Sequence, residues 1–359
     1  MATYKSIRYL VPDEVVEHTD SINALADVNT STVAPEVGQT LKWSDANSRW
    51  QPADIEESGS SGTQKALFGF GHHNGGTVIT NVVSSAGVVA ADVNAAGTYR
   101  GNLAASSYGG DKAIFGFGTT TSGATNITNL VSSSGVVSID QTGVGTAREE
   151  LAAASFGGDK AIFGFGMYTG NYSNINVNIT NLVSNVGVVS SDTSGVGVIR
   201  VFLAAAGYGG DKAIFAFGSN NNGANVSSLV SNTGVVASDT TGVGTAKDDL
   251  AAAGYGGDKA IFGFGASGAY SNTVVSTTNL VSNLGVVATD TTGVGTAKTN
   301  LAASGYGVDK AIFGFGEIQN GNNTNVTNLV SNVGVVSSDQ TGVGQARGGL
   351  SAAGYSSTA

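Results

Sequence analysis

The chain repeats one eight-residue stretch, Asp159-Lys-Ala-Ile-Phe-Gly-Phe-Gly166, with small changes. The other copies are residues 64–71, 111–118, 211–218, 258–265 and 309–316. The lysines of successive copies are 47, 48, 52, 47 and 51 residues apart. A period of this length, held nearly constant, indicates one supersecondary unit that recurs with a loop of variable length.

Each repeat divides into four candidate β-strands. In one repeat these are Leu151–Phe156, Lys160–Phe165, Ile179–Ser184 and Gly187–Ser191. The links between the first and second strands and between the third and fourth are short and contain glycine, which favours antiparallel neighbours. Four short strands in ~45 residues is the size of one blade of a β-propeller.

The residue types also suit sheets packed around an axis. The first strand is rich in alanine, as expected where strands from all repeats converge. In the second strand, strict alternation would place Phe163 and Phe165 on one face and Ile162, Gly164 and Gly166 on the other. We therefore expect the phenylalanine of one sheet to enter the space over the glycine of the next.

The two ends of the repeat region complement each other. The first repeat begins at its second strand, at Lys65, and the chain ends in an unpaired first strand, Gly349–Tyr355. Pairing these segments would remove two open sheet edges. The sequence thus predicts an all-β fold, a six-bladed β-propeller over residues 63–359 that is closed by its C-terminal strand.

Residues 1–62 differ from the repeats and are predicted to form a separate region. All three prolines and both tryptophans lie there, and the polar linker Glu56–Gly62 ends it. The segments Thr40–Trp43 and Arg49–Pro52 read as a hairpin. Because two strands alone are marginally stable, we expect Trp43 and Trp50 to pack against the propeller, another copy of the chain or a partner protein.

Composition limits the possible partners. The net charge is −10, of which −6 falls in residues 1–62, and no basic stripe is present, so nucleic acid is not expected as a partner. No apolar run approaches the ~20 residues of a membrane span, so membrane insertion is not expected either. The N-terminus has no signal-peptide pattern. The absence of cysteine excludes disulfides and thiolate metal sites.

Two patterns resemble known families. The run Arg148-x-x-Leu-Ala-Ala-Ala, followed by an apolar strand ending in glycine, a variable loop, another strand and an Asp-containing turn, resembles the kelch repeat, with Phe-Gly-Phe-Gly in place of its double glycine and without its tryptophan. The run Thr-Asn-Leu-Val-Ser-Asn-x-Gly-Val-Val, which ends at Val287 and Val336, resembles repeats in tailed-bacteriophage virion proteins, especially fibre and appendage proteins. The segment Leu25–Trp43 is similar to one found near attachment regions of such proteins.

The resemblance implies a kelch-like virion structural protein, located in the virion. We expect a tail fibre or appendage component that attaches through residues 1–62, including Trp43 and Trp50, to other virion proteins and forms a homo-oligomer in the particle. The propeller would present a face to a host-surface glycan or protein, or to a neighbouring virion protein. The alternatives are a purely structural capsid or neck decoration protein and an enzyme that degrades polysaccharide.

Catalytic, metal and cofactor sites are not expected. The adjacent His72 and His73 lack further metal ligands at fixed positions and read as loop residues. Aspartates recur before the lysine of the repeat and near its fourth strand, where they either coordinate calcium or bond turn amides; we favour turn bonding because no segment has the dense acidic pattern of a calcium loop. The basic residues repeated at Arg148 and its equivalents could pair with them.

Variation between repeats is confined to two kinds of connection. The loops between second and third strands are 72–79, 119–127, 167–179, 219–226, 266–277 and 317–326. The links that lead to each first strand also vary, and in a meander both open on the same side. Loops on a rigid scaffold commonly bind ligands, although these loops could also be free to drift. The candidate contact residues are His72, His73, Glu149, Glu150, Tyr168, Tyr172, Asn174, Asp248, Asp249 and Tyr270.

Overall fold

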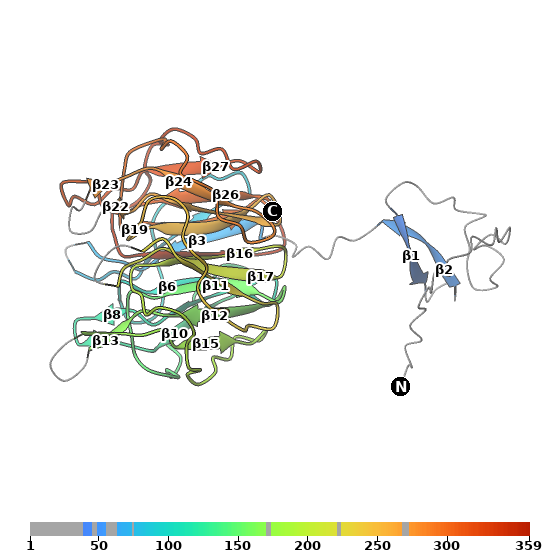
Figure 1. Ribbon diagram of the computed structural model, residues 1–359, viewed down its shortest axis with the longest axis horizontal. Helices are drawn as coiled ribbons and strands as arrows, with labels where there is room; N and C mark the ends of the chain where they lie inside the picture. Colours follow the sequence, from blue (N-terminus) through green and yellow to red (C-terminus); the bar gives the residue numbers. More distant parts are fainter. Residues whose placement is uncertain are drawn as a thin grey trace. The chain divides into compact units, whose positions relative to one another are not determined.

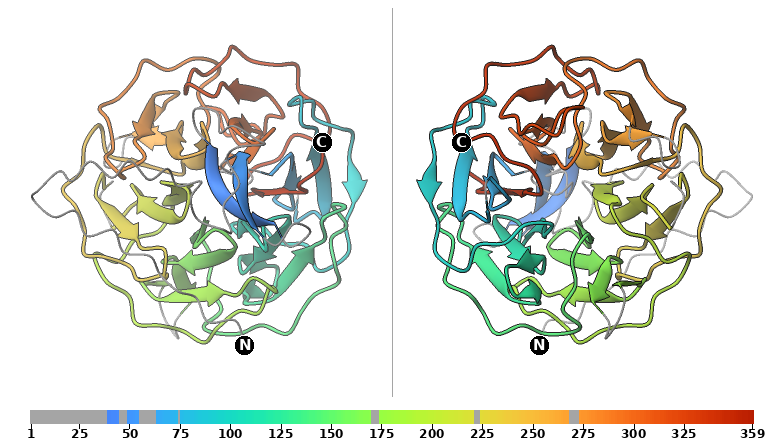
Figure 2. Two further views of the ribbon diagram at one scale, coloured as in Figure 1. Left: turned by 90° about the vertical axis from the view of Figure 1, so that its right-hand side faces the viewer. Right: turned by 90° about the vertical axis from the view of Figure 1, so that its left-hand side faces the viewer.

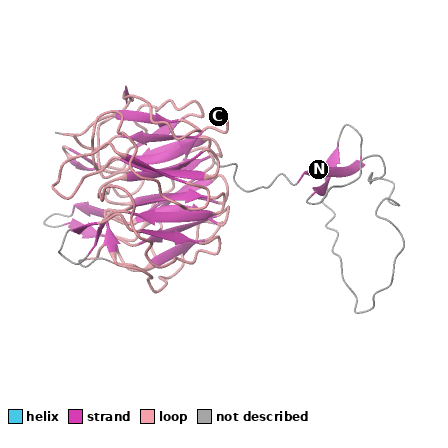
Figure 3. Ribbon diagram, turned by 90° about the horizontal axis from the view of Figure 1, so that it is seen from above, coloured by secondary structure: helices cyan, strands magenta, loops and turns pink. Residues whose placement is uncertain are grey.

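The computed structural model describes residues 39–44, 49–54, 63–73, 75–169, 174–220, 224–267 and 273–359. The chain divides into two compact units, Met1–Ser58 and Gly59–Ala359, and the break falls inside the polar linker 56–62. Over the described residues the fold is all-β, with antiparallel strands and no helix (Figures 1 and 3).

In the first unit, the described residues form a hairpin of β1 (Gln39–Ser44) and β2 (Arg49–Asp54). The strands are antiparallel, and Trp43 lies opposite Trp50 in the register. The hairpin expected from the sequence is therefore present and slightly longer. What the two tryptophans pack against stays a prediction.

The second unit contains six main sheets, each built on one copy of the repeated stretch. Their first strands are β6 (Ala104–Tyr108), β11 (Ala152–Phe156), β16 (Ala204–Tyr208), β20 (Ala251–Tyr255), β25 (Ala302–Tyr306) and β28 (Ser351–Tyr355). Their second strands are β7 (Lys112–Gly116), β12 (Lys160–Gly164), β17 (Lys212–Ala216), β21 (Lys259–Gly263), β26 (Lys310–Gly314) and β3 (Lys65–Gly69). Their third strands are β10 (Thr128–Val131), β15 (Thr180–Val183), β18 (Ser227–Val230), β24 (Thr278–Val281), β27 (Thr327–Val330) and β4 (Ile79–Val83).

The expected fourth strand is mostly absent from the described residues, which corrects the prediction for Gly187–Ser191. Only the sheet of β3 and β4 gains a fourth strand, β5 (Val93–Asn94). Elsewhere single bridges such as Val183 to Val189 take its place. Side chains add hydrogen bonds at this edge: the Leu182 amide donates to Ser190 Oγ at 2.9 Å, and Asn181 Nδ2 donates to the Ser190 carbonyl at 3.0 Å.

The six sheets follow one another around a ring (Figure 2). Each first strand contacts the first strands of the two neighbouring sheets, and β28 contacts both β25 and β6. The alanine-rich strands therefore line the axis, as expected. The two ends of the repeat region meet in one sheet, because β28 pairs antiparallel with β3, placing Ser351 opposite Gly69 and Tyr355 opposite Lys65.

The two phenylalanines of each repeat point to opposite neighbours, so the prediction that they share one face is wrong. Phe163 packs on Phe117 of the preceding sheet, with ring centroids 5.0 Å apart, whereas Phe165 packs on Phe215 of the following sheet at 5.1 Å. The cause is the backbone of Phe165, whose φ of 65° leaves the strand conformation and breaks the alternation of side chains.

The expected packing of large on small residues is present. A Cβ added to Gly164 would lie 2.9 Å from Cζ of Phe215, so the ring occupies the space that a side chain would need. One repeat carries Ala216 at this position. There the ring pair Phe217–Phe262 has a centroid distance of 5.5 Å, the longest of the six pairs.

A buried cation covers each phenylalanine pair. Arg148 has a fully buried side chain, lies with its guanidinium carbon 4.4 Å from the Phe117 ring centroid, and donates to Asn181 Oδ1 at 2.7 Å and to the Phe165 carbonyl at 2.9 Å. It thereby joins two sheets. Its equivalents are Arg100, Arg200, Lys247, Lys298 and Arg347.

The repeated aspartates have structural partners. Asp192 accepts hydrogen bonds from the Thr146 amide at 3.0 Å and from Thr146 Oγ1 at 2.7 Å, across a sheet boundary, and Arg148 lies 3.8 Å away. Asp159 accepts from Lys160 at 2.9 Å and from Asn185 at 3.0 Å. Amide, hydroxyl and ammonium donors thus occupy these carboxylates, but the Thr146 amide lies 46 residues from Asp192 in the chain, so this contact joins separate segments and is not the local turn bonding that the sequence predicts.

We predict that enlarging Gly164 destabilises the ring in proportion to the added volume. Gly164→Val should lower the free energy of unfolding by about 2–3 kcal/mol through overpacking against Phe215. Gly164→Ala should cost less than about 1.5 kcal/mol, because Ala216 already shows the tolerated form. Denaturant unfolding measures both. In the control Gly254→Ala the nearest atom lies 3.5 Å away, and a change within ~0.5 kcal/mol is expected; an equal loss in all three variants would contradict this account.

We also predict that β28 is indispensable. A chain that stops at Leu350 leaves β3 without its partner and should lose more than about 5 kcal/mol of unfolding free energy, a large share of a domain's stability. Thermal unfolding followed by circular dichroism measures the loss. A chain that stops at Ser356 removes only the exposed residues 357–359 and should unfold like the full chain. Equal stability of the two truncations would contradict the role given to β28.

Candidate functional site

The variable connections meet at one end of the ring. In every sheet the link before the first strand pairs with the loop after the second strand: Glu149 bridges Met167, and β19 (Lys247–Asp248) pairs with β22 (Ala266–Ser267). We call this end, made by the variable loops and links, the loop face. The opposite end, made by the short turns such as 157–159, is the turn face.

Three of the variable loops extend as small hairpins. These are β8 (Thr119–Thr120) with β9 (Gly123–Ala124), β13 (Met167–Thr169) with β14 (Asn174–Asn176), and β22 with β23 (Thr273–Val274). The hairpins of β9 and β13 touch each other, and Figure 1 shows β8, β13, β22 and β23 on the same side of the ring. The predicted variation in loop length therefore makes some loops project from the loop face as hairpins.

Six residues at the centre of the loop face form a closed circle of backbone hydrogen bonds. They are the last residues of the links, and we call them the mouth ring: Asn102, Glu150, Phe202, Asp249, Asn300 and Gly349. The amide of each donates to the carbonyl of the preceding member, and the Asn102 amide donates to Gly349, at distances from 2.7 to 3.2 Å. All six have φ between 50° and 58°, so this left-handed conformation belongs to the architecture.

A small cavity of about 80 Å³ lies inside the mouth ring. Its lining also includes the residue after each ring member, Leu103 in the first case and a leucine in all six links. Leucines and alanines of the first strands line a second cavity of about 100 Å³. At the loop face, the cavity on the axis is thus lined first by the mouth ring, which is mostly polar. The leucines that follow the ring members, which we call the leucine collar, line it next.

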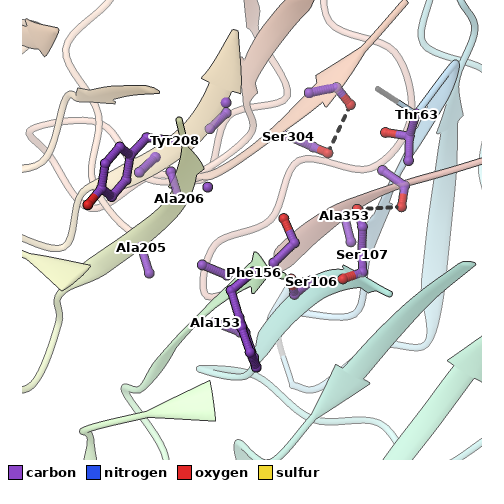
Figure 4. Close-up of a pocket in the computed structure, with 18 of the residues that line it drawn as sticks. Thr63, Ser106, Ser107, Ala153, Phe156, Ala205, Ala206, Tyr208, Ser304 and Ala353 are labelled. Carbon is purple, nitrogen blue, oxygen red and sulfur yellow. Dashed lines mark hydrogen bonds between the residues drawn. The ribbon is translucent and has the colours of Figure 1, made fainter. Parts of the chain in front are cut away.

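At the turn face the axis holds a larger cavity of about 210 Å³ (Figure 4). Two of its serines have backbone partners: Ser107 Oγ donates to the Gly354 carbonyl at 2.8 Å, and Ser304 Oγ donates to the Gly305 carbonyl at 3.2 Å. Thr63, where the repeats begin, also lines this cavity. Alanine, glycine and serine recur in its lining from sheet to sheet, with Tyr208, Lys212 and Lys259 among the larger members. This uniformity makes it the weaker candidate for a binding site.

Two acids of the mouth ring have strongly shifted protonation. Burial raises the pKa of Glu150 well above its ordinary value, and the charges of Asp249, Glu149 and Glu317 raise it further. Burial, together with Asp248 and Glu317, raises the pKa of Asp249 to about 7. Within the described ranges, neither carboxylate has an ion pair or a hydrogen bond. The mouth therefore concentrates carboxylates without balancing cations.

The structure brings several of the predicted contact residues together and separates others. Glu149, Glu150, Asp248 and Asp249 surround the mouth, and His72 joins them through Nε2, which lies 2.9 Å from Asn102 Oδ1. His73 follows in the same loop. Tyr168 and the exposed Asn174 belong to the β13–β14 hairpin, farther along the loop face. Tyr172 and Tyr270 lie outside the described residues.

Four residues of this site lie in the variable loops and links but were not among the predicted contact residues. Asn102, Phe202 and Asn300 are members of the mouth ring, and Glu317 adds charge beside Asp249 and Gly348. The signal was available in part, since each ring member directly precedes the Leu-Ala or Leu-Ser that opens a first strand. The circle of hydrogen bonds, however, depends on the left-handed backbone that only the structure reveals.

Within the part of the chain that the structure describes, no three acidic or histidine side chains stand close enough to hold a metal ion. Among the same residues no helix has the length and apolar character to cross a membrane. Comparison with protein-family models found no match, and a search of curated proteins found no relative.

We predict that the mouth acids make the protein less stable as pH rises from about 4 to 7. An unfolded aspartate ionises near pH 4, while folded Asp249 keeps its proton to about pH 7, so the unfolded chain binds fewer protons in this window and the free energy of unfolding falls with pH. Asp249→Asn should therefore raise stability at pH 8 by about 2–4 kcal/mol and leave it unchanged at pH 4.

Melting temperatures of the full chain between pH 4 and 8.5 test this prediction. Burial lowers the pKa of Lys247 and of Lys298 to about 8, so these two lysines titrate above the range from pH 4 to 7. Both lysines are present in the unmodified chain and in the Asp249→Asn variant. The control Asp159→Asn removes a carboxylate whose pKa is lowered by its hydrogen bond from Lys160, so no gain at pH 8 is expected. If both substitutions raised stability at pH 8, the cause would be the reduced net negative charge of the protein and not the burial of Asp249.

Proposed function

We propose that the ring of sheets is a six-bladed, kelch-like β-propeller closed by its C-terminal strand. The support is the cyclic order of contacts between first strands, together with the pairing of β28 with β3. Each sheet takes the place of one blade, with its alanine-rich first strand nearest the axis. The short bridges that replace most fourth strands make these blades narrower than four full strands would.

We further propose that the protein is a structural component of a bacteriophage virion, in a tail fibre or appendage. The proposal draws its virion role from the sequence resemblance of the repeated Thr-Asn-Leu-Val-Ser run and of Leu25–Trp43. In this proposal the separate N-terminal unit attaches to other virion proteins, with several copies of the chain in the particle. The loop face then meets a host-surface glycan or protein, or a neighbouring virion protein.

One observation carries the choice of the loop face as the binding surface. Each turn at the turn face keeps the same construction in almost every repeat, with two left-handed residues, as at Gly157 and Gly158. At the loop face, by contrast, hairpins, irregular loops, acids and aromatic residues differ from sheet to sheet. A scaffold that keeps one end uniform and diversifies the other is typical of a protein that binds through the diversified end.

We predict that attachment and folding separate at the linker. A chain lacking residues 1–58 should give a folded ring with the thermal transition of the intact second unit, because residues 59–359 form a compact unit of their own. The same chain should fail to enter virions in a complementation assay, measured by mass spectrometry of purified particles. Its incorporation at the normal level would contradict the attachment role of the N-terminal unit.

The same folded ring distinguishes the binding role from its alternatives. Binding of the labelled ring to host cells, lost on exchanging the β13–β14 hairpin for the short loop 219–226, would support the fibre or appendage role. Binding that survives this exchange, or no binding at all, would favour a decoration protein. Release of reducing sugar from host polysaccharide would favour an enzyme.

A further inference from the structure

The mouth ring is chemically asymmetric although its backbone is regular. Going round the circle of hydrogen bonds, Phe202 stands between Glu150 and Asp249, and the other half consists of Asn300, Gly349 and Asn102. All six residues line the same cavity. One half of the mouth therefore combines an aromatic ring with two carboxyl groups, and the other half is neutral.

Packing of the hydrophobic core does not explain why Glu150, Phe202 and Asp249 occupy these positions. Phe202 belongs to none of the six interlocking pairs of phenylalanines, and the hydrophobic clusters of the described residues do not include it. Glu150 and Asp249 are half-buried, and their carboxyl groups have no partner among the described residues, although asparagine or glycine serves the same backbone position elsewhere in the ring. Neither carboxyl is shut off from water, so a ligand that reaches the mouth can contact both of them.

The ligand that suits this half of the mouth is an organic cation. Carboxylates attract any cation, but the described residues offer no group of three ligands for a metal ion, and an aromatic face adds attraction for an ammonium group. The cavity of about 80 Å³ is narrow, and the leucine collar below it is apolar. A slender alkyl chain that ends in an ammonium group suits a cavity of this volume.

We propose that the mouth ring binds the side-chain ammonium group of a lysine on a partner protein. Glu150 and Asp249 supply the negative charge, Phe202 contacts the methylene groups and the cation, and the side-chain oxygens of Asn102 and Asn300 are available as acceptors. This inference deepens the proposed function and rests on it only for the choice of the loop face as the binding face. It makes the preferred partner a protein with an exposed lysine.

Binding of lysine should depend on pH in a defined direction. A carboxylate must be ionised to hold the ammonium group, and lowering the pH through about 7 protonates Asp249. The charged groups that face the mouth are Glu149, Asp248, Glu317 and the two ring acids, with His72 beside Asn102. Affinity should therefore be higher at pH 8.5 than at pH 5.5, and the bound cation should in turn favour the ionised acids.

Titration of the full chain with Nα-acetyl-lysine amide, followed by saturation-transfer NMR or calorimetry, tests the proposal. Saturable binding at pH 8.5 is expected, at least about tenfold weaker for Glu150→Gln and for Asp249→Asn, which keep the shape of the side chain and remove its charge. Phe202→Leu should weaken binding by roughly threefold or more, as the loss of a cation–π contact predicts. The control Asp159→Asn at the turn face should bind as the unmodified chain does.

Three outcomes would overturn the proposal. These are an absence of binding at pH 8.5, binding that both charge-removing variants retain, and tighter binding of calcium or of glucosamine than of the lysine amide. Unfolding curves of each variant confirm that the ring is intact. The test is independent of the virion assays, because a purified chain that binds the lysine amide through these residues does so whether or not residues 1–58 direct it into a particle.

Discussion

The structure depends on the contact between the phenylalanine of one sheet and the glycine of the sheet before it. Phe215 over Gly164 is one case, and the absence of a Cβ lets the two sheets approach closely enough for the ring pair and the buried cation to fit between them. Since the same contact recurs, each junction between sheets has nearly the same geometry. A repeated junction of fixed angle closes into a ring when the angle divides a full turn, and the alanine strands then meet at the axis.

The central regularities of this fold were predictable from the sequence, because a repeat presents the same local evidence several times. The order of strands, their antiparallel pairing and the joining of Tyr355 to Lys65 followed from the period and from the incomplete repeats at the two ends. The faces of the sheet on which Phe163 and Phe165 lie could not be predicted in this way. Alternation assumes an extended backbone, and the left-handed φ of Phe165 ends the strand one residue earlier than the apolar pattern suggests. The predicted fourth strand is replaced in most sheets by isolated bridges such as Val183 to Val189, a difference that the apolar pattern of the repeat does not reveal.

The sequence predicted which face of the ring carries the candidate site, but not which residues form it. Variation between repeats identified the loops and links, and their placement at one end follows from the meander. Which of these residues meet at the axis depends on a circle of hydrogen bonds among positions far apart in the chain, such as Gly349 and Asn102. Glu149 and Glu150 were predicted together as contact residues, yet only Glu150 lines the mouth cavity, while Glu149 pairs with Met167. Which of two neighbours lines the mouth is a property of the closed ring.

The sheet that unites both ends of the repeat region has a consequence for how such a protein can change in evolution. The unit of sequence begins in the middle of a sheet, so adding or deleting one whole unit always leaves a half-sheet at each end, and the two halves can still combine. The number of units is therefore not encoded at the seam. The number of units is set instead by the angle between neighbouring sheets. Alanine in place of the glycine under each phenylalanine ring, if present in every unit, would therefore change how many sheets close the ring.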